Sequence, residues 1–86
     1  MATGSVITCT GTAWTLIFDG AVSGQFSGSA QSLRGRAYLR VATSVPAIND
    51  KGFALNPDVV IPLIVPTNEK VYAKPINGVS CQVVLG

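Results

Sequence analysis

Short runs of β-branched and aromatic residues alternate with glycine, proline, asparagine, aspartate and serine along the whole chain. The first group favours extended backbone because bulk at Cβ restricts the chain, and the second group favours turns. No window of about 11 residues places apolar side chains at the i, i+3, i+4 spacing of an amphipathic helix. We therefore predict an all-β fold without helices, a small antiparallel β-sandwich or barrel of about seven short strands.

Each predicted strand ends at turn residues. In chain order the segments are Ser5–Thr10, Ala13–Phe18, Val22–Ser27, Ala37–Thr43, Phe53–Leu55, Val59–Val65, Lys70–Lys74 and Val79–Leu85. The short fifth segment can be counted with the sixth, which keeps the total near seven. Residues 28–36, which are polar and contain glycine, are predicted to form a link. Asp19-Gly20 predicts a tight turn, and Asn77-Gly78 predicts a hairpin between the last two strands.

The clearest alternation lies in residues 37–43. Ala37, Leu39 and Val41 are predicted to face the core, whereas Tyr38, Arg40 and Ala42 point the other way. Pro62 interrupts the apolar run Val59–Val65, and proline cannot donate a hydrogen bond to a neighbouring strand. That segment is therefore predicted to be an edge strand or to carry a bulge.

The chain has 86 residues, which predicts a single domain over residues 1–86. Its composition is 48% hydrophobic and 12% charged, against roughly 25% charged in typical soluble domains. A domain this small exposes most of its residues, so the shortage of charge suggests a surface covered by other copies or by another protein. A surface coated with uncharged polar side chains is the alternative.

The charge pattern and the apolar runs argue against two classes of partner. The net charge is +2, and the run Leu33–Arg40 lacks the dense basic face with interleaved aromatics of a nucleic-acid binder. The longest apolar run, Val59–Val65, falls far short of the roughly 20 residues of a membrane span. Residues 1–4 show no signal-peptide features. We expect no nucleic acid, no membrane, and synthesis in a cytoplasm.

The residues that usually carry catalysis or bind metal are scarce. The chain has no histidine, and its two cysteines, Cys9 and Cys81, fall short of the about four ligands of a zinc site. The cysteines can be buried small hydrophobes or, if the terminal strands are neighbours, a disulfide. The four acidic residues stand in turn contexts: Asp19, Asp50, Asp58 and Glu69. We predict no catalytic residue, no cofactor and no metal, and therefore no enzyme.

The candidate contact residues are instead aromatic, basic or edge-forming: Trp14, Tyr38, Arg40, Pro62 and Tyr72. Trp14 can anchor an interface or stack on a sugar, although a single tryptophan in a run such as AWTLIF is more often core. Tyr38 shares its predicted face with Arg40, which makes it the better candidate for an exposed contact.

Residues 41–86 resemble a pattern in small virion proteins of tailed bacteriophages. That pattern consists of a strand ending in A-x-S-x-P-A, a D-x-G loop, an apolar strand, E-x-x-Y-A-(R/K) and a closing G-x-(A/S)-x-V-V-V. The matching residues are Ala42, Ser44, Pro46, Ala47, Asp50, Gly52, Glu69, Tyr72, Ala73, Lys74, Gly78, Val83 and Val84. The resemblance covers about half of the chain, and residues 1–40 have no comparable match.

The resemblance implies a structural component of a phage particle, made in the host bacterial cytoplasm and located in the virion. A capsid decoration or cement protein is the leading expectation, with the major capsid protein or other virion proteins as partners and a homotrimer as the favoured oligomer. The alternative is a tail or fibre module that binds a host receptor or glycan through Trp14, Tyr38 and Tyr72.

Overall fold

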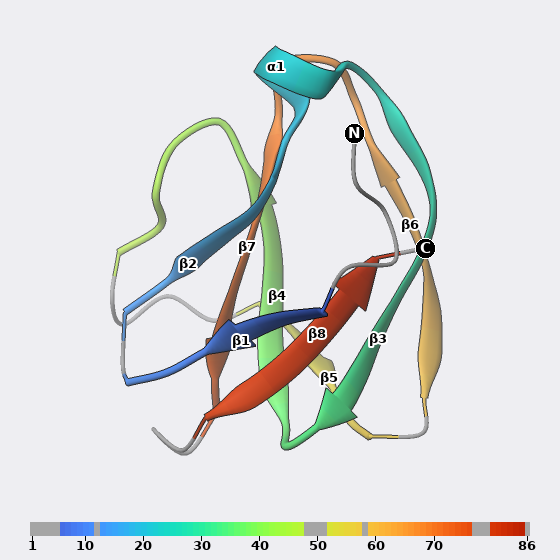
Figure 1. Cartoon of the computed structure of the whole chain (residues 1–86). Helices are drawn as coiled ribbons and strands as arrows, with labels where there is room; N and C mark the ends of the chain where they lie inside the picture. The colour runs from blue at the N-terminus through green and yellow to red at the C-terminus, as the bar shows by residue number, and fades with distance from the viewer. Residues whose placement is uncertain (1–5, 12, 48–51, 58, 77–79, 86) are drawn as a thin grey trace.

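Eight strands and one short helix follow one another in the computed structural model, which describes residues 6–11, 13–47, 52–57, 59–76 and 80–85 (Figure 1). The elements are β1 (Val6–Cys9), β2 (Thr15–Asp19), α1 (Gly20–Ser23), β3 (Phe26–Arg34), β4 (Ala37–Ala42), β5 (Phe53–Leu55), β6 (Val60–Val65), β7 (Lys70–Pro75) and β8 (Cys81–Leu85). The all-β prediction is confirmed, with eight strands rather than about seven.

The strands form two four-stranded antiparallel sheets that pack on one another as a sandwich. Sheet A has the order β1-β8-β3-β6, and sheet B has the order β2-β7-β4-β5. The first strand thus pairs with the last, β2 with β7, β3 with β6 and β4 with β5. This is the order produced when one long hairpin is rolled up into two sheets, and it defines an eight-stranded jelly roll.

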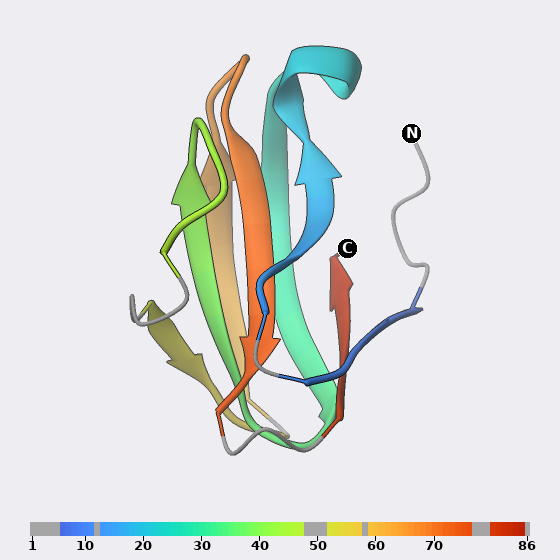
Figure 2. The same cartoon turned by 90° about the vertical axis from the view of Figure 1, so that its left-hand side faces the viewer.

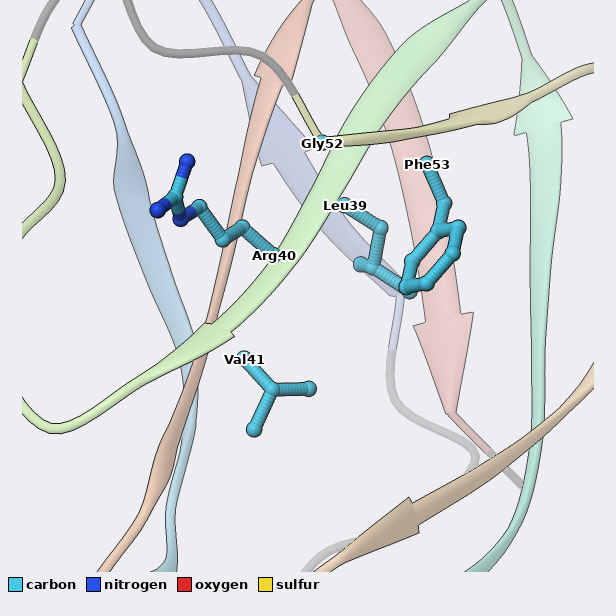
Figure 3. Close-up of a pocket in the computed structure, with 5 residues that line it drawn as sticks. All are labelled: Leu39, Arg40, Val41, Gly52 and Phe53. Atoms are coloured by element: carbon cyan, nitrogen blue, oxygen red, sulfur yellow. The ribbon is translucent and has the colours of Figure 1, made fainter.

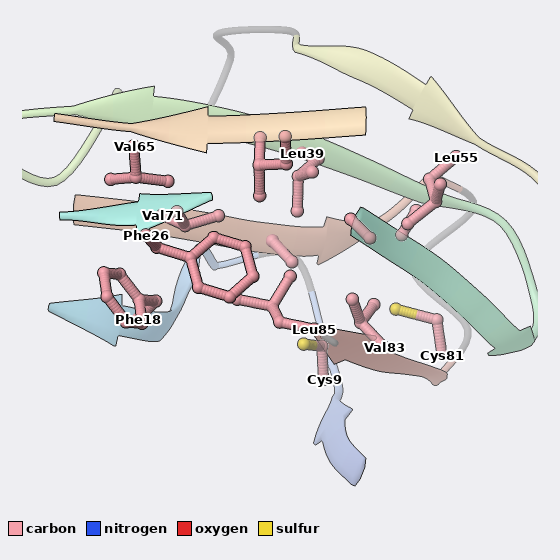
Figure 4. Close-up of a cluster of buried hydrophobic side chains, with 14 residues drawn as sticks. Cys9, Phe18, Phe26, Leu39, Leu55, Val65, Val71, Cys81, Val83 and Leu85 are labelled. Atoms are coloured by element: carbon pink, nitrogen blue, oxygen red, sulfur yellow. The ribbon is translucent and has the colours of Figure 1, made fainter. Parts of the chain in front are cut away.

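The core lies between the two sheets, where both contribute apolar side chains (Figure 4). The alternation predicted for β4 is confirmed, because Ala37 and Leu39 are fully buried and Val41 packs against the core. β6 is an edge strand of sheet A, as Pro62 predicted. The four-residue β1 forms the opposite edge of that sheet.

The link predicted for residues 28–36 is wrong, since most of it belongs to β3, the longest strand. Its small polar side chains alternate with inward-facing residues such as Phe26 and Ala30, both buried. After β3 the chain crosses from sheet A to sheet B. There the buried Ser32 hydroxyl donates a hydrogen bond to the carbonyl of Gly35, which has a φ of 74°.

The tight turn predicted at Asp19-Gly20 is wrong, and the predicted strand Val22–Ser27 is wrong in its first half, since β3 begins only at Phe26. Before Phe26 the chain forms the one-turn helix α1, at one end of the molecule (Figure 2). The Asp19 carboxylate caps this helix by accepting a hydrogen bond from the Ala21 amide at 2.9 Å. The hairpin predicted between the last two strands is wrong as well, because β7 lies in sheet B and β8 in sheet A. Asn77-Gly78 itself lies outside the described residues.

Candidate functional site

Four of the five residues singled out in the sequence lie on the outer side of sheet B. Tyr38 and Arg40 come from β4 and Tyr72 from β7, and Trp14 directly precedes β2. The register places Leu16, Tyr72 and Arg40 in one row across three strands. Pro62 lies apart from them, exposed on the edge strand β6 of the other sheet. The structure therefore divides the candidates between two opposite surfaces.

A buried cation joins the aromatic residues of sheet B. The Lys74 ammonium lies 4.9 Å from the ring centre of Trp14 and 5.9 Å from that of Tyr38, within cation–π range. The Trp14 indole N–H donates a hydrogen bond of 2.9 Å to the carbonyl of Ala47, which lies in the connection after β4. That connection thus folds back over the sheet, and Trp14 and Lys74 are each only 9% exposed.

This arrangement limits what the outer side of sheet B can bind. Trp14 holds Lys74 close to its ring, and Tyr72 is 3% exposed, so neither ring offers an open platform for a sugar. Tyr38 and Arg40 are half-buried and remain partly accessible. The cluster stabilises the fold by fastening the connection after β4 to the sheet.

The outer face of sheet A has a different character. We call the A face the outward side chains of β1, β6 and β8 together with those of β3 as far as Gln31, and the exposed Leu33 and Arg34 follow at the end of β3. Its members are Val6, Thr8, Ser27, Ser29, Gln31, Val60, Pro62, Ile64, Gln82 and Val84. None of these side chains is charged. The strand registers align Val6, Val84, Gln31 and Val60 in a single row that crosses the whole sheet.

The A face exposes apolar area mainly at its two edges. Val60 and Ile64 on β6 are 56% and 66% exposed, and Val6 on β1 is about half exposed. Arg34 pairs with Gln82 at the end of β3, so one positive charge borders the face. Because charge is depleted in the cores of protein interfaces, the A face suits contact with another protein better than sheet B does.

A shallow hollow of about 360 Å³ lies beside the exposed edge of β4 (Figure 3). β5 pairs with β4 only as far as Leu39, which leaves the edge of β4 from Arg40 onward without a neighbouring strand among the described residues. Val41 and Gly52 complete the lining, and the exposed ring of Phe53 lies beside Leu39. The lining is mixed, since Val41 and Phe53 are apolar and Arg40 is positively charged.

The two thiols lie in the core, on the neighbouring strands β1 and β8 of sheet A. Burial raises the pKa of Cys9, and burial together with the neighbouring Cys9 raises the pKa of Cys81 to about 12. Both side chains are therefore neutral thiols near pH 7 and weak nucleophiles. Within the described residues no group of three or more Cys, Asp or Glu side chains is placed to hold a metal ion.

Sequence reasoning found Pro62 but missed the rest of the A face. The available signal was the alternation of small polar residues with buried ones in residues 26–32, which was interpreted as a link. Val6 and Val84 belong to the A face only because β1 and β8, from opposite ends of the chain, pair with each other.

No helix in the described part of the chain has the length and apolar character needed to cross a membrane. Family models, curated proteins and solved structures all gave no match to this chain.

Proposed function

We propose that this chain is a structural subunit of a bacteriophage particle, a decoration or cement protein that binds the capsid shell and stabilises it through self-association. The observation that carries the proposal is the A face, whose ten side chains carry no charge and which exposes Val6 at one edge and Val60 and Ile64 at the other. Val60, Pro62 and Ile64 form a contiguous exposed apolar strip along β6, and such a strip on a small domain marks a contact surface. The proposed function then consists of packing against other proteins.

Two further observations support a role in a virion. The jelly-roll strand order recurs in viral capsid domains, although it also occurs in lectins and enzymes and does not imply a function by itself. The resemblance of residues 41–86 to small virion proteins of tailed phages points to the same setting. The expected partners are the major capsid protein or other virion proteins, together with further copies of this chain.

The edge of β6 is the part of the A face that we expect a neighbouring copy to contact. Among the described residues β6 pairs with β3 alone, and it presents Val60 and Ile64 next to Pro62. Unpaired edges favour further association, and closed symmetry hides them. A homotrimer in which each copy covers its neighbour's β6 edge fits the three-fold sites of an icosahedral shell.

The alternative, a tail or fibre module that binds a glycan, receives less support from the geometry. Of the three proposed stacking residues, Trp14 and Tyr72 are buried, and only Tyr38 is partly accessible. Glycan binding that is lost in a Tyr38→Ala variant that still folds would favour this alternative.

The proposal is tested by adding purified protein to capsids that lack decoration proteins, prepared from the phage that encodes the chain. We expect the wild type to co-sediment with the shells and to raise the temperature at which they fall apart. Ile64→Lys places a charge on the A face and should abolish both effects. Val22→Lys is the matched control, because Val22 is 83% exposed on α1, away from that face.

A wild-type protein that remains a stable monomer and ignores the capsids would overturn the proposal. If Ile64→Lys binds the shells as well as Val22→Lys does, the contact lies elsewhere and the A face is not the surface that binds the shell.

A further inference from the structure

Cys9 and Cys81 lie directly opposite one another where β1 pairs with β8. Both side chains are fully buried, and both belong to the core cluster (Figure 4). They are free thiols. The two thiols are close enough for Cys9 to contribute to the raised pKa of Cys81. The pair therefore connects the first strand of the fold with the last.

The spacing of such a pair is close to that of a disulfide. Directly opposite residues in antiparallel strands have Cβ atoms about 4.5–5.5 Å apart, and a disulfide needs about 3.5–4.5 Å. A movement of about 1 Å therefore suffices. β1 can make this movement because it has four residues, lies at the edge of sheet A and has β8 as its one neighbour among the described strands of that sheet.

We propose that Cys9 and Cys81 form a reversible oxidation site, which a low-molecular-weight disulfide converts into a cross-strand disulfide that fastens β1 to β8. The inference stands on the register and the burial of the two thiols, and it does not depend on the proposed role in a virion. It gives the chain one state under reducing conditions and a second, more stable state under oxidising conditions.

The reaction is two successive exchanges. One cysteine thiolate attacks a sulfur of the small disulfide, which breaks that S–S bond, releases one small thiolate and leaves a mixed disulfide on the protein. The second cysteine thiolate then attacks the protein sulfur of the mixed disulfide and releases the other small thiolate. The protein loses two electrons and two protons, and the small disulfide gains them as two thiols.

Burial controls the rate of this reaction. The thiolate is the attacking species, and the raised pKa values of both thiols keep them protonated near neutral pH. Neither sulfur can meet a solvent molecule while β1 is in place. Oxidation therefore requires β1 to open from the sheet edge, and its rate should rise with pH and with low concentrations of urea.

The disulfide should stabilise the fold because it closes nearly the whole chain into a loop. Cross-links that close long loops remove the most entropy from the unfolded chain. For a domain of this size we expect the melting temperature to rise by about 10–20 °C. The gain should vanish when the bond is reduced.

The test incubates the full chain with oxidised glutathione at pH 8.5, with and without a concentration of urea below the unfolding transition. We expect the intact mass to fall by two hydrogen atoms per chain. Digestion should release one peptide pair that joins Cys9 to Cys81, and the melting temperature should rise until dithiothreitol restores the starting value. Cys9→Ala and Cys81→Ala are the controls, and neither should gain stability.

Three outcomes would each overturn the inference. The first is that both thiols stay free under all of these conditions. The second is that they end only as glutathione adducts or as bonds between chains. The third is an intrachain bond that lowers the melting temperature. Because the oxidised and reduced wild type are compared directly, the test still decides if the alanine variants fail to fold.

Discussion

The side chains that surround Lys74 come from distant parts of the chain. Its ammonium lies near the rings of Trp14 and Tyr38, and the register explains why, since Tyr38 and Lys74 are paired on neighbouring strands. The sequence identified both rings as contact candidates. It could not show that a cation lies close to both of them, because Trp14 and Lys74 meet only once β2 pairs with β7.

Gly35 is the residue whose replacement should disturb the fold most specifically. Its φ of 74° favours glycine, and a Cβ there would lie 2.9 Å from the carbonyl oxygen of Ser80. Gly11 has nearly the same φ, 75°, but a Cβ there meets nothing within 4 Å. Chemical denaturation should therefore show that Gly35→Ala loses at least about 1 kcal/mol more unfolding free energy than Gly11→Ala.

Equal losses in the two variants would mean that the left-handed backbone conformation accounts for the whole cost. The close approach of β8 to the crossing between β3 and β4 would then have no energetic role.

At the scale of elements, local pattern predicted the existence of strands better than their partners. β4, β5 and β6 appear close to where alternation and β-branched residues placed them, because these signals are local. Asn77-Gly78 was interpreted as a hairpin, yet turn residues indicate only that the chain reverses and do not fix the strand that it joins. The one-turn helix α1 was missed because it is too short to show a helical period.

The connection after β4 should depend on Trp14 for its position. Trp14→Phe keeps an aromatic ring beside Lys74 but removes the indole N–H that donates to Ala47. We expect the unfolding free energy to fall by about 1 kcal/mol, as for one lost hydrogen bond. Amide hydrogen exchange should become faster in residues 43–47 and stay unchanged in β8. Unchanged exchange in both regions would show that other contacts hold the connection.

At the scale of the whole molecule, the jelly-roll order creates the surface on which the account rests. Val6 and Val84 come from opposite ends of the chain, and Gln31 and Val60 come from its middle, yet the registers align them across sheet A. No local pattern could reveal this row, since it exists only after the long hairpin is rolled up. Composition indicated a covered surface, and the fold identifies the A face as the candidate.

Sedimentation equilibrium tests most directly whether the β6 edge of the A face joins copies of this chain. We predict that the wild type forms a trimer whose stability changes little between low and high salt, because the A face is uncharged. Ile64→Lys should be a folded monomer, whereas Val22→Lys should match the wild type. A monomeric wild type, or an Ile64→Lys variant that assembles as well as the Val22→Lys control, would contradict the account.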